Sequence, residues 1–181
     1  MEQVKINNKD IIIMNLTHYF ITEQNYNPVI VHGINDEIWL ENMNSDYKII
    51  RIVSKYIHNN EQLNLNRFRS KQITKKLKRK TFSLKMKVLN IYIDLGDNVT
   101  NMEEEDSKDV SVAINKMSDI KKSMMSEIFP DIVEKTNHKE KGMEFLFKIT
   151  DDINVSNEKK NTLIDILFSD LRLIQTTADI L

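Results

Sequence analysis

Three polar residues in the first third of the chain have the types and spacing of a metal-dependent hydrolytic site. Asp46 and Lys48 form an Asp-x-Lys pair, and Asp36 precedes it by ten residues. In a strand, residues i and i+2 point to the same face, so Asp46 and Lys48 would lie together. Carboxylates bind Mg²⁺, which activates water, while a lysine steadies developing charge. The spacing therefore makes Asp36, Asp46 and Lys48 candidate catalytic residues of a nuclease. The alternative is turn chemistry, since Asp is common in tight turns.

A second candidate surface comes from the uneven distribution of charge. The chain has 181 residues and a net charge of −1, yet no Asp or Glu occurs between Gln62 and Ile93, where ten Lys and Arg residues lie. Such a segment can contact anionic lipid headgroups or phosphates in a salt-sensitive way. Between residues 61 and 80 Phe68 is the one aromatic residue, so a base-stacking platform for nucleic acid is not favoured. The alternative is a solvated helix face. The candidate surface residues are Lys75, Lys76, Lys78 and Arg79.

The acidic stretch that follows is a weak candidate for a metal site. Carboxylates could gather a divalent cation, but the stretch lacks the alternating spacing and glycine of an EF-hand, and a solvated acidic loop is the alternative. No other cofactor is predicted. The absence of cysteine excludes disulfides, zinc–thiolate sites and thiol nucleophiles. The residues of this acidic candidate are Glu103, Glu104, Glu105 and Asp106.

The elements that would position these residues follow from hydrophobic periodicity. Spacing of three to four predicts a helix over 8–24 that stops before Pro28. Three short strands, 29–34, 37–41 and 47–54, form the simplest β-meander. A basic helix over 61–80 would turn Leu65, Phe68, Ile73 and Leu77 inward. A central strand over 85–93 and another over 110–114 come next, and helices are predicted over 119–129, 140–149 and 156–180.

This order predicts one α/β (α+β) domain spanning 1–181, with a single mixed sheet of about five strands flanked by helices. Helix, meander, helix and strand is also the order of restriction-endonuclease-like enzymes, so that topology is a possible outcome. Trp39, the one tryptophan, is predicted to be a core anchor, with Ile38 and Leu40 pointing the opposite way. A strand covered on both faces follows from that pattern.

Several segments together resemble the cytosolic N-terminal domain of a group of bacterial rhomboid proteins, which are intramembrane serine proteases. They are "DEIWLE" at 36–41, the "YKIIRIV" strand, "MKVLNIYI", and "VSVAINKMSDIKKSMMSEIFPD" with its Phe129–Pro130 pair. The resemblance implies a chain on the cytoplasmic face of the membrane, soluble itself, with a multi-pass membrane protease domain after residue 181. That protease needs a Gly-x-Ser and a His in transmembrane helices, so no residue here inherits a catalytic role.

The leading hypothesis is therefore a non-catalytic regulatory, partner-handling or substrate-handling domain of a rhomboid-type serine protease. Its expected partners are the membrane-embedded protease domain, an anionic lipid surface or another protein. The alternatives are a metal-dependent nuclease acting through Asp36, Asp46 and Lys48, and a nucleic-acid-binding module that uses the basic helix without chemistry.

Overall fold

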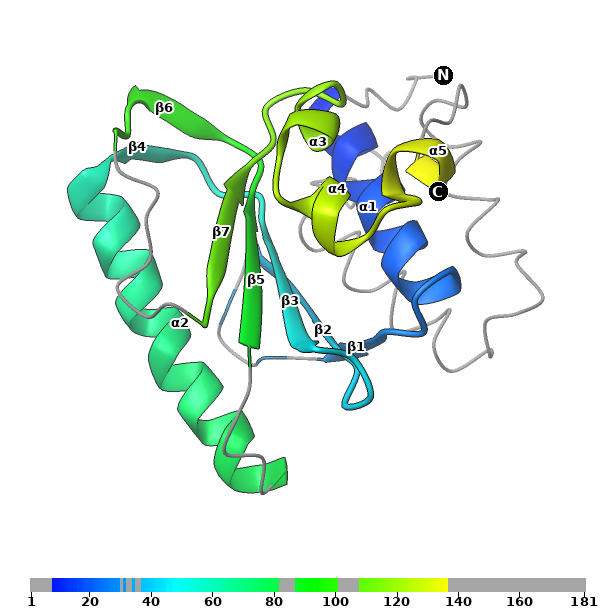
Figure 1. Cartoon of the computed structure of the whole chain (residues 1–181). Helices are drawn as coiled ribbons and strands as arrows, with labels where there is room; N and C mark the ends of the chain where they lie inside the picture. The colour runs from blue at the N-terminus through cyan, green and yellow to red at the C-terminus, as the bar shows by residue number, and fades with distance from the viewer. Residues whose placement is uncertain are drawn as a thin grey trace, which may run out of the picture.

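The chain folds into a mixed five-stranded sheet with helices on both faces (Figure 1). The structure, a computed structural model, describes residues 8–29, 31, 34, 37–81, 87–100 and 108–136. The predicted helices over 140–149 and 156–180 lie outside these residues. In chain order the elements are α1 (Asn8–Thr22), β1 (Asn27–Val29), β2 (Glu37–Glu41), β3 (Tyr47–Val53), β4 (Ile57–Asn59), α2 (Asn60–Thr81), β5 (Lys87–Tyr92), β6 (Leu95–Asn98), β7 (Val110–Ala113), α3 (Asp119–Lys122), α4 (Met125–Ile128) and α5 (Ile132–Thr136).

The sheet has the order β1-β2-β3-β5-β7 and combines two pairing modes. β1, β2 and β3 form an antiparallel meander, whereas β5 pairs in parallel with both β3 and β7. A parallel neighbour requires a crossover connection, which α2 supplies between β3 and β5. The predicted mixed sheet of about five strands flanked by helices is confirmed. The restriction-endonuclease-like topology stays a prediction.

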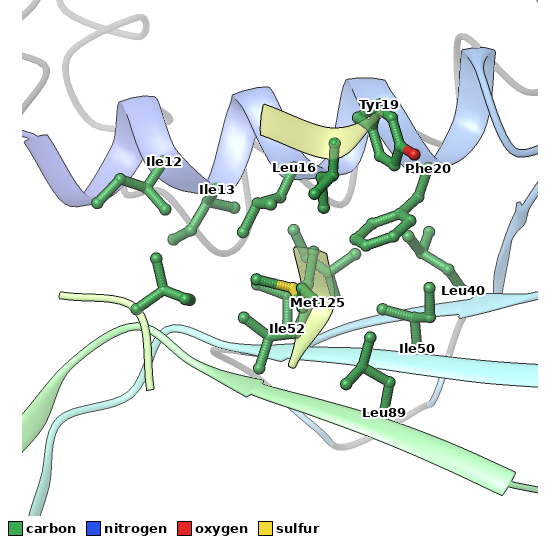
Figure 2. Close-up of a cluster of buried hydrophobic side chains, with 14 of the residues drawn as sticks. Ile12, Ile13, Leu16, Tyr19, Phe20, Leu40, Ile50, Ile52, Leu89 and Met125 are labelled. Atoms are coloured by element: carbon green, nitrogen blue, oxygen red, sulfur yellow. The ribbon is translucent and has the colours of Figure 1, made fainter. Parts of the chain in front are cut away.

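Opposite faces of the sheet bury different side chains, as the strand period of two requires. Ile38 and Leu40 of β2 face α1, where Figure 2 shows Leu40, Ile50, Ile52 and Leu89 meeting α1. Trp39 points to the α2 side, is 1% exposed, and packs with Ile49 and Val88. The predicted role of Trp39 as a core anchor is confirmed. The α1 side of the core contains chiefly Ile12, Ile13, Leu16, Tyr19, Phe20, Ile50, Ile52, Leu89 and Met125.

The end of α1 is fixed by the chain that follows it. Asn25 adopts a left-handed conformation with φ of 59°, which asparagine tolerates better than most residues. The Tyr26 hydroxyl then donates to the Tyr47 carbonyl and lies 2.8 Å from Ser45 Oγ, tying the helix end to the β2–β3 turn. Burial raises the pKa of Tyr26 to about 12, against the lowering effect of its hydrogen bond with Ser45. The predicted stop before Pro28 is confirmed, with α1 two residues shorter than expected.

The β2–β3 turn has the chemistry that its composition predicted. The Asn42 Oδ1 accepts a hydrogen bond from the Asn44 amide at 2.9 Å, and the Ser45 amide donates to the Asn42 carbonyl at 3.2 Å. An asparagine side chain that accepts a hydrogen bond from the amide two residues later takes the place of a backbone hydrogen bond in the turn, which is common for asparagine between strands. The Asn42 Nδ2 also donates to the Gln24 carbonyl at 2.9 Å, so the same residue holds the turn against the end of α1.

Several element boundaries differ from those predicted. The first strand is Asn27–Val29 at the sheet edge rather than 29–34, and Val31 and Ile34 lie outside it. Pro28 has no N–H to donate, which suits an edge strand. The helix predicted over 119–129 is broken, because Ser123 is extended with ψ of 168° and its Oγ accepts from the Met125 amide. The small β4–β6 sheet and α5 were not predicted, and β6 begins after the end of the strand predicted over 85–93.

Candidate functional site

Helix α2 covers the face of the sheet opposite α1 (Figure 1). Among its described side chains, those that are buried recur every three to four positions: Leu63, Asn66, Ser70 and Thr74. Leu65 and Phe68, predicted to point inward, are instead 66% and 64% exposed. That prediction is wrong, and its correction turns two large apolar side chains to the outer surface of the most basic helix. Ile73 and Leu77 are partly buried against Trp39, as expected.

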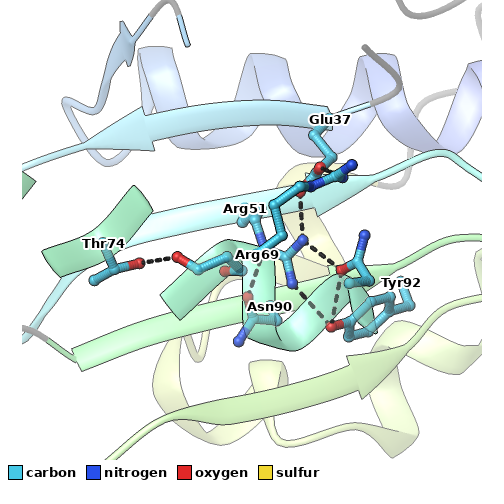
Figure 3. A network of polar contacts seen from close by, with 8 residues as sticks. Glu37, Arg51, Arg69, Thr74, Asn90 and Tyr92 are labelled. Carbon is cyan, nitrogen blue, oxygen red and sulfur yellow. Dashed lines mark hydrogen bonds and ion pairs between the residues drawn. The ribbon is translucent and has the colours of Figure 1, made fainter. Parts of the chain in front are cut away.

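The reason for this rotation is a buried polar network on the sheet beneath α2 (Figure 3). Arg51 of β3 is fully buried, and its Nε donates to Asn90 Oδ1 at 2.8 Å. One terminal nitrogen donates to Asn66 Oδ1 at 2.7 Å and the other to the Tyr92 hydroxyl at 2.8 Å. Because a buried polar group without a partner costs free energy, α2 presents Asn66 here rather than an apolar residue.

Glu37 neutralises the centre of the network. One carboxylate oxygen accepts from Arg51 and the other from Arg69 of α2, while the Glu37 side chain is 1% exposed. The Arg51 guanidinium also lies 5.8 Å from the ring centre of Trp39 and 5.4 Å from that of Tyr92. The network thus joins β2, β3, β5 and α2 in one buried cluster. Apart from Arg69, whose side chain is 42% exposed, its members are enclosed between the sheet and α2, so we assign the network a structural role.

The outward face of α2 is exposed over the part of the helix whose side chains the structure describes. Leu65, Phe68, Lys75 and Lys76 are all exposed there, and Arg69 lies at its edge with 42% of its side chain exposed. The side chains of Lys78 and Arg79, the other two predicted surface residues, lie outside the described part of the chain. The predicted basic helix therefore carries apolar groups among its cations on the outer side. We call Leu65, Phe68, Lys75 and Lys76 the outer face.

The structure describes two of the three predicted nuclease residues, Asp46 and Lys48. Asp46 is exposed in the β2–β3 turn, and Lys48 Nζ donates to the Ser45 carbonyl at 3.1 Å. Asp36 lies outside the described residues. Asp46 thus lies in the turn, and Lys48 lies at the start of β3 with its amine on a turn carbonyl. Their catalytic role stays a hypothesis.

The acidic candidate metal residues Glu103, Glu104, Glu105 and Asp106 also lie outside the described residues. Among those that the structure describes, no group of three or more His, Asp or Glu side chains is placed to hold a metal ion. Within the same ranges, no helix combines the length and the apolar character needed to cross a bilayer.

The buried network was missed by the analysis of the sequence, although a signal for it exists. Arg51 and Asn90 each interrupt a run of apolar residues in a strand that is otherwise buried. Two such interruptions in apolar strands point to polar groups that need partners in the interior. Comparison with known protein families finds no match, and comparison with curated proteins finds none either.

Proposed function

We propose that this chain is a non-catalytic domain that acts at the cytoplasmic surface of a membrane, as the regulatory or partner-handling part of a rhomboid-type serine protease. The outer face of α2 would make the membrane contact. The observation that carries this proposal is the exposure of Leu65 and Phe68 beside Lys75 and Lys76. Lysines next to protruding apolar side chains are typical of helices that lie in the interface of an anionic bilayer.

The energetics of such a contact are sufficient for reversible binding. Each Lys or Arg close to an anionic surface contributes roughly 1 kcal/mol. Fully burying a Leu or Phe side chain contributes about 1.5–3 kcal/mol, of which an interfacial contact gains a part. The Lys and Arg residues of α2 lie on one helix of 22 residues, roughly 33 Å long, so several of them can reach the membrane surface at the same time. Attraction of this kind weakens as salt is added.

The rhomboid context is supported by the resemblance of the sequence alone. Several of the residues that carry it, among them Trp39, Ile50 and Leu89, lie in the core, so this part of the likeness concerns the fold and not a reactive site. A direct test is to label the full-length gene product with a serine-directed activity probe. We expect labelling of the full-length product in membranes and none of this chain alone. An unlabelled full-length product would contradict the protease context.

The membrane contact is tested by sedimentation with vesicles of phosphatidylcholine containing phosphatidylglycerol. We expect binding at low salt that falls on raising the salt, and that is lost when Lys75, Lys76, Lys78 and Arg79 are changed to Glu. Changing Leu65 and Phe68 to Ser should weaken binding at any salt. The matched control changes Met124 and Val133 to Ser, which are exposed apolar residues of the opposite layer.

Two results would overturn the membrane proposal. One is the absence of vesicle binding at low salt. The other is that duplex DNA displaces the chain completely from vesicles, that the Lys and Arg changes weaken binding to DNA and to vesicles equally, and that the Leu65 and Phe68 changes have no effect. The second result would favour the nucleic-acid-binding alternative, which depends on charge and not on exposed apolar groups.

A further inference from the structure

A cavity of about 380 Å³ opens between the segment before α2 and the first turns of that helix. This volume is within the range of about 300–1,000 Å³ that small-molecule sites occupy. The polar side chains on its wall are Lys55, Tyr56, Gln62, Asn66 and Arg69, with Leu65 and Ile57 supplying apolar wall. No acidic residue is among the described residues that line it.

The two amides on the wall have their oxygens engaged elsewhere. The Gln62 Oε1 accepts from the His58 amide at 2.7 Å, and the Asn66 Oδ1 accepts from Arg51 at 2.7 Å. An amide that accepts through its oxygen has its NH₂ group left to donate. Each of these two lining side chains therefore has an NH₂ group that can donate a hydrogen bond.

Arg69 is held in place by the buried network. Its terminal nitrogen donates to Glu37, whose carboxylate is shared with Arg51, and its Nε is buried with no hydrogen bond among the described residues. The guanidinium has five N–H donors in a fixed fork, so one contact with Glu37 leaves others directed away from that carboxylate. Two arginines on one glutamate give the cluster a local charge of +1, and Lys55 adds another. The wall is thus built from donors and cations.

We propose that this cavity binds the phosphate of a lipid headgroup that bears a phosphomonoester. Such a group carries a charge of about −1.5 to −2 near neutral pH, which matches the two cations Lys55 and Arg69. Arginine binds phosphate oxygens through its planar fork, and the two amides complete the set of donors. This inference rests on the proposed membrane contact of α2.

The rim of the cavity argues for a lipid as the source of the phosphate. Tyr56 is 50% exposed, Leu65 is 66% exposed, and Phe68 follows Leu65 on the same side of α2 at 64%. Protruding apolar side chains suit insertion between lipids, whereas a folded protein partner would need a complementary groove. The basic outer face runs on from this rim along α2. One bilayer surface could therefore meet the rim, the cavity and the lysines together.

The test compares vesicles of phosphatidylcholine with phosphatidate or with phosphatidylglycerol, matched for surface charge. We expect binding of the full chain to be about tenfold tighter to phosphatidate vesicles, because one added charge-assisted hydrogen bond is worth at least that factor. Lys55→Gln should abolish the preference. Lys75→Gln removes one charge outside the cavity and should weaken binding to both vesicles equally. Arg69→Lys keeps the charge without the fork and should reduce the preference.

Each outcome decides the inference. Equal binding to the two vesicles, or a preference unchanged by both Lys55→Gln and Arg69→Lys, would overturn the phosphate site but leave the proposed membrane contact intact. Loss of the preference in millimolar inorganic phosphate at constant ionic strength would make free phosphate the ligand and overturn the lipid assignment. Absence of binding to either vesicle would contradict the membrane contact itself.

Discussion

Replacing Arg51 with methionine should destabilise the fold by about 3–5 kcal/mol, the usual cost of removing one partner from a buried ion pair. Arg51 is fully buried and donates to Glu37, Asn66, Asn90 and Tyr92. Its removal leaves the Glu37 carboxylate in the interior with Arg69 as its remaining partner, and leaves three neutral acceptors without this donor. For a chain of this size the same loss corresponds to a melting temperature lower by roughly 6–20 °C.

The assay is urea unfolding followed by the fluorescence of Trp39, which lies 5.8 Å from the Arg51 guanidinium carbon and reports on the same layer. The matched control is Lys48→Met on the same strand. Lys48 is only half-buried and its amine contacts one turn carbonyl, so its replacement should change stability by no more than about 0.5 kcal/mol.

A double variant, Arg51→Met with Glu37→Leu, separates the effect of leaving the Glu37 charge unpaired from the effect of lost packing. Removing both charges of a buried pair costs less than removing one, so the double variant should be more stable than Arg51→Met by at least about 1 kcal/mol. Arg69 then loses its carboxylate, but its side chain is 42% exposed and can be solvated. The reasoning is refuted if Arg51→Met unfolds like the unmodified chain, or if the double variant is less stable than the single one.

Three further predictions concern the core, the turn and the nuclease hypothesis. Trp39→Ala should cost about 3–5 kcal/mol in urea unfolding, and native Trp39 fluorescence should resist acrylamide quenching; ready quenching would place the indole outside the core. Because the pKa of Tyr26 is raised to about 12, its contribution to stability is complete below its unfolded pKa of roughly 10 and is lost as pH rises through 12, so Tyr26→Phe should flatten the fall in stability over that window. A slope unchanged by Tyr26→Phe would contradict that assignment. Neither the chain nor its Asp46→Ala variant should cleave DNA with Mg²⁺, and cleavage that Asp46→Ala abolishes would restore the nuclease hypothesis.

The fold was largely predictable because its signals are local. Pro28 and Asn25 mark the end of α1, and the asparagines between β2 and β3 mark a turn, each through backbone preferences of single residues. The alternation around Trp39 located a strand buried on both faces. Boundaries failed where one side chain overrides the pattern, as at Ser123, which interrupts a run that otherwise has helical composition.

The candidate site was less predictable, because its geometry depends on residues distant in sequence. The basic composition of α2 is plain in the chain, but the side that its cations and Leu65 and Phe68 occupy is not. That orientation is set by Asn66 meeting Arg51, which is fifteen residues away, while Arg51 meets Asn90 thirty-nine residues away. The periodicity of apolar residues predicts which side of a helix is buried, but it does not show which polar residues will become partners in the folded chain.

The sequence alone thus determined the two long helices, the five strands of the mixed sheet and the buried tryptophan, since each follows from the preferences and periodicity of neighbouring residues. Only the tertiary structure decided which face of α2 is buried, how Glu37 is shared by two arginines, and that Lys55 and Arg69 line one cavity. The physical reason is that a buried charge must find its partners wherever the folded chain brings them, and those partners fix the rotation of the helix above it.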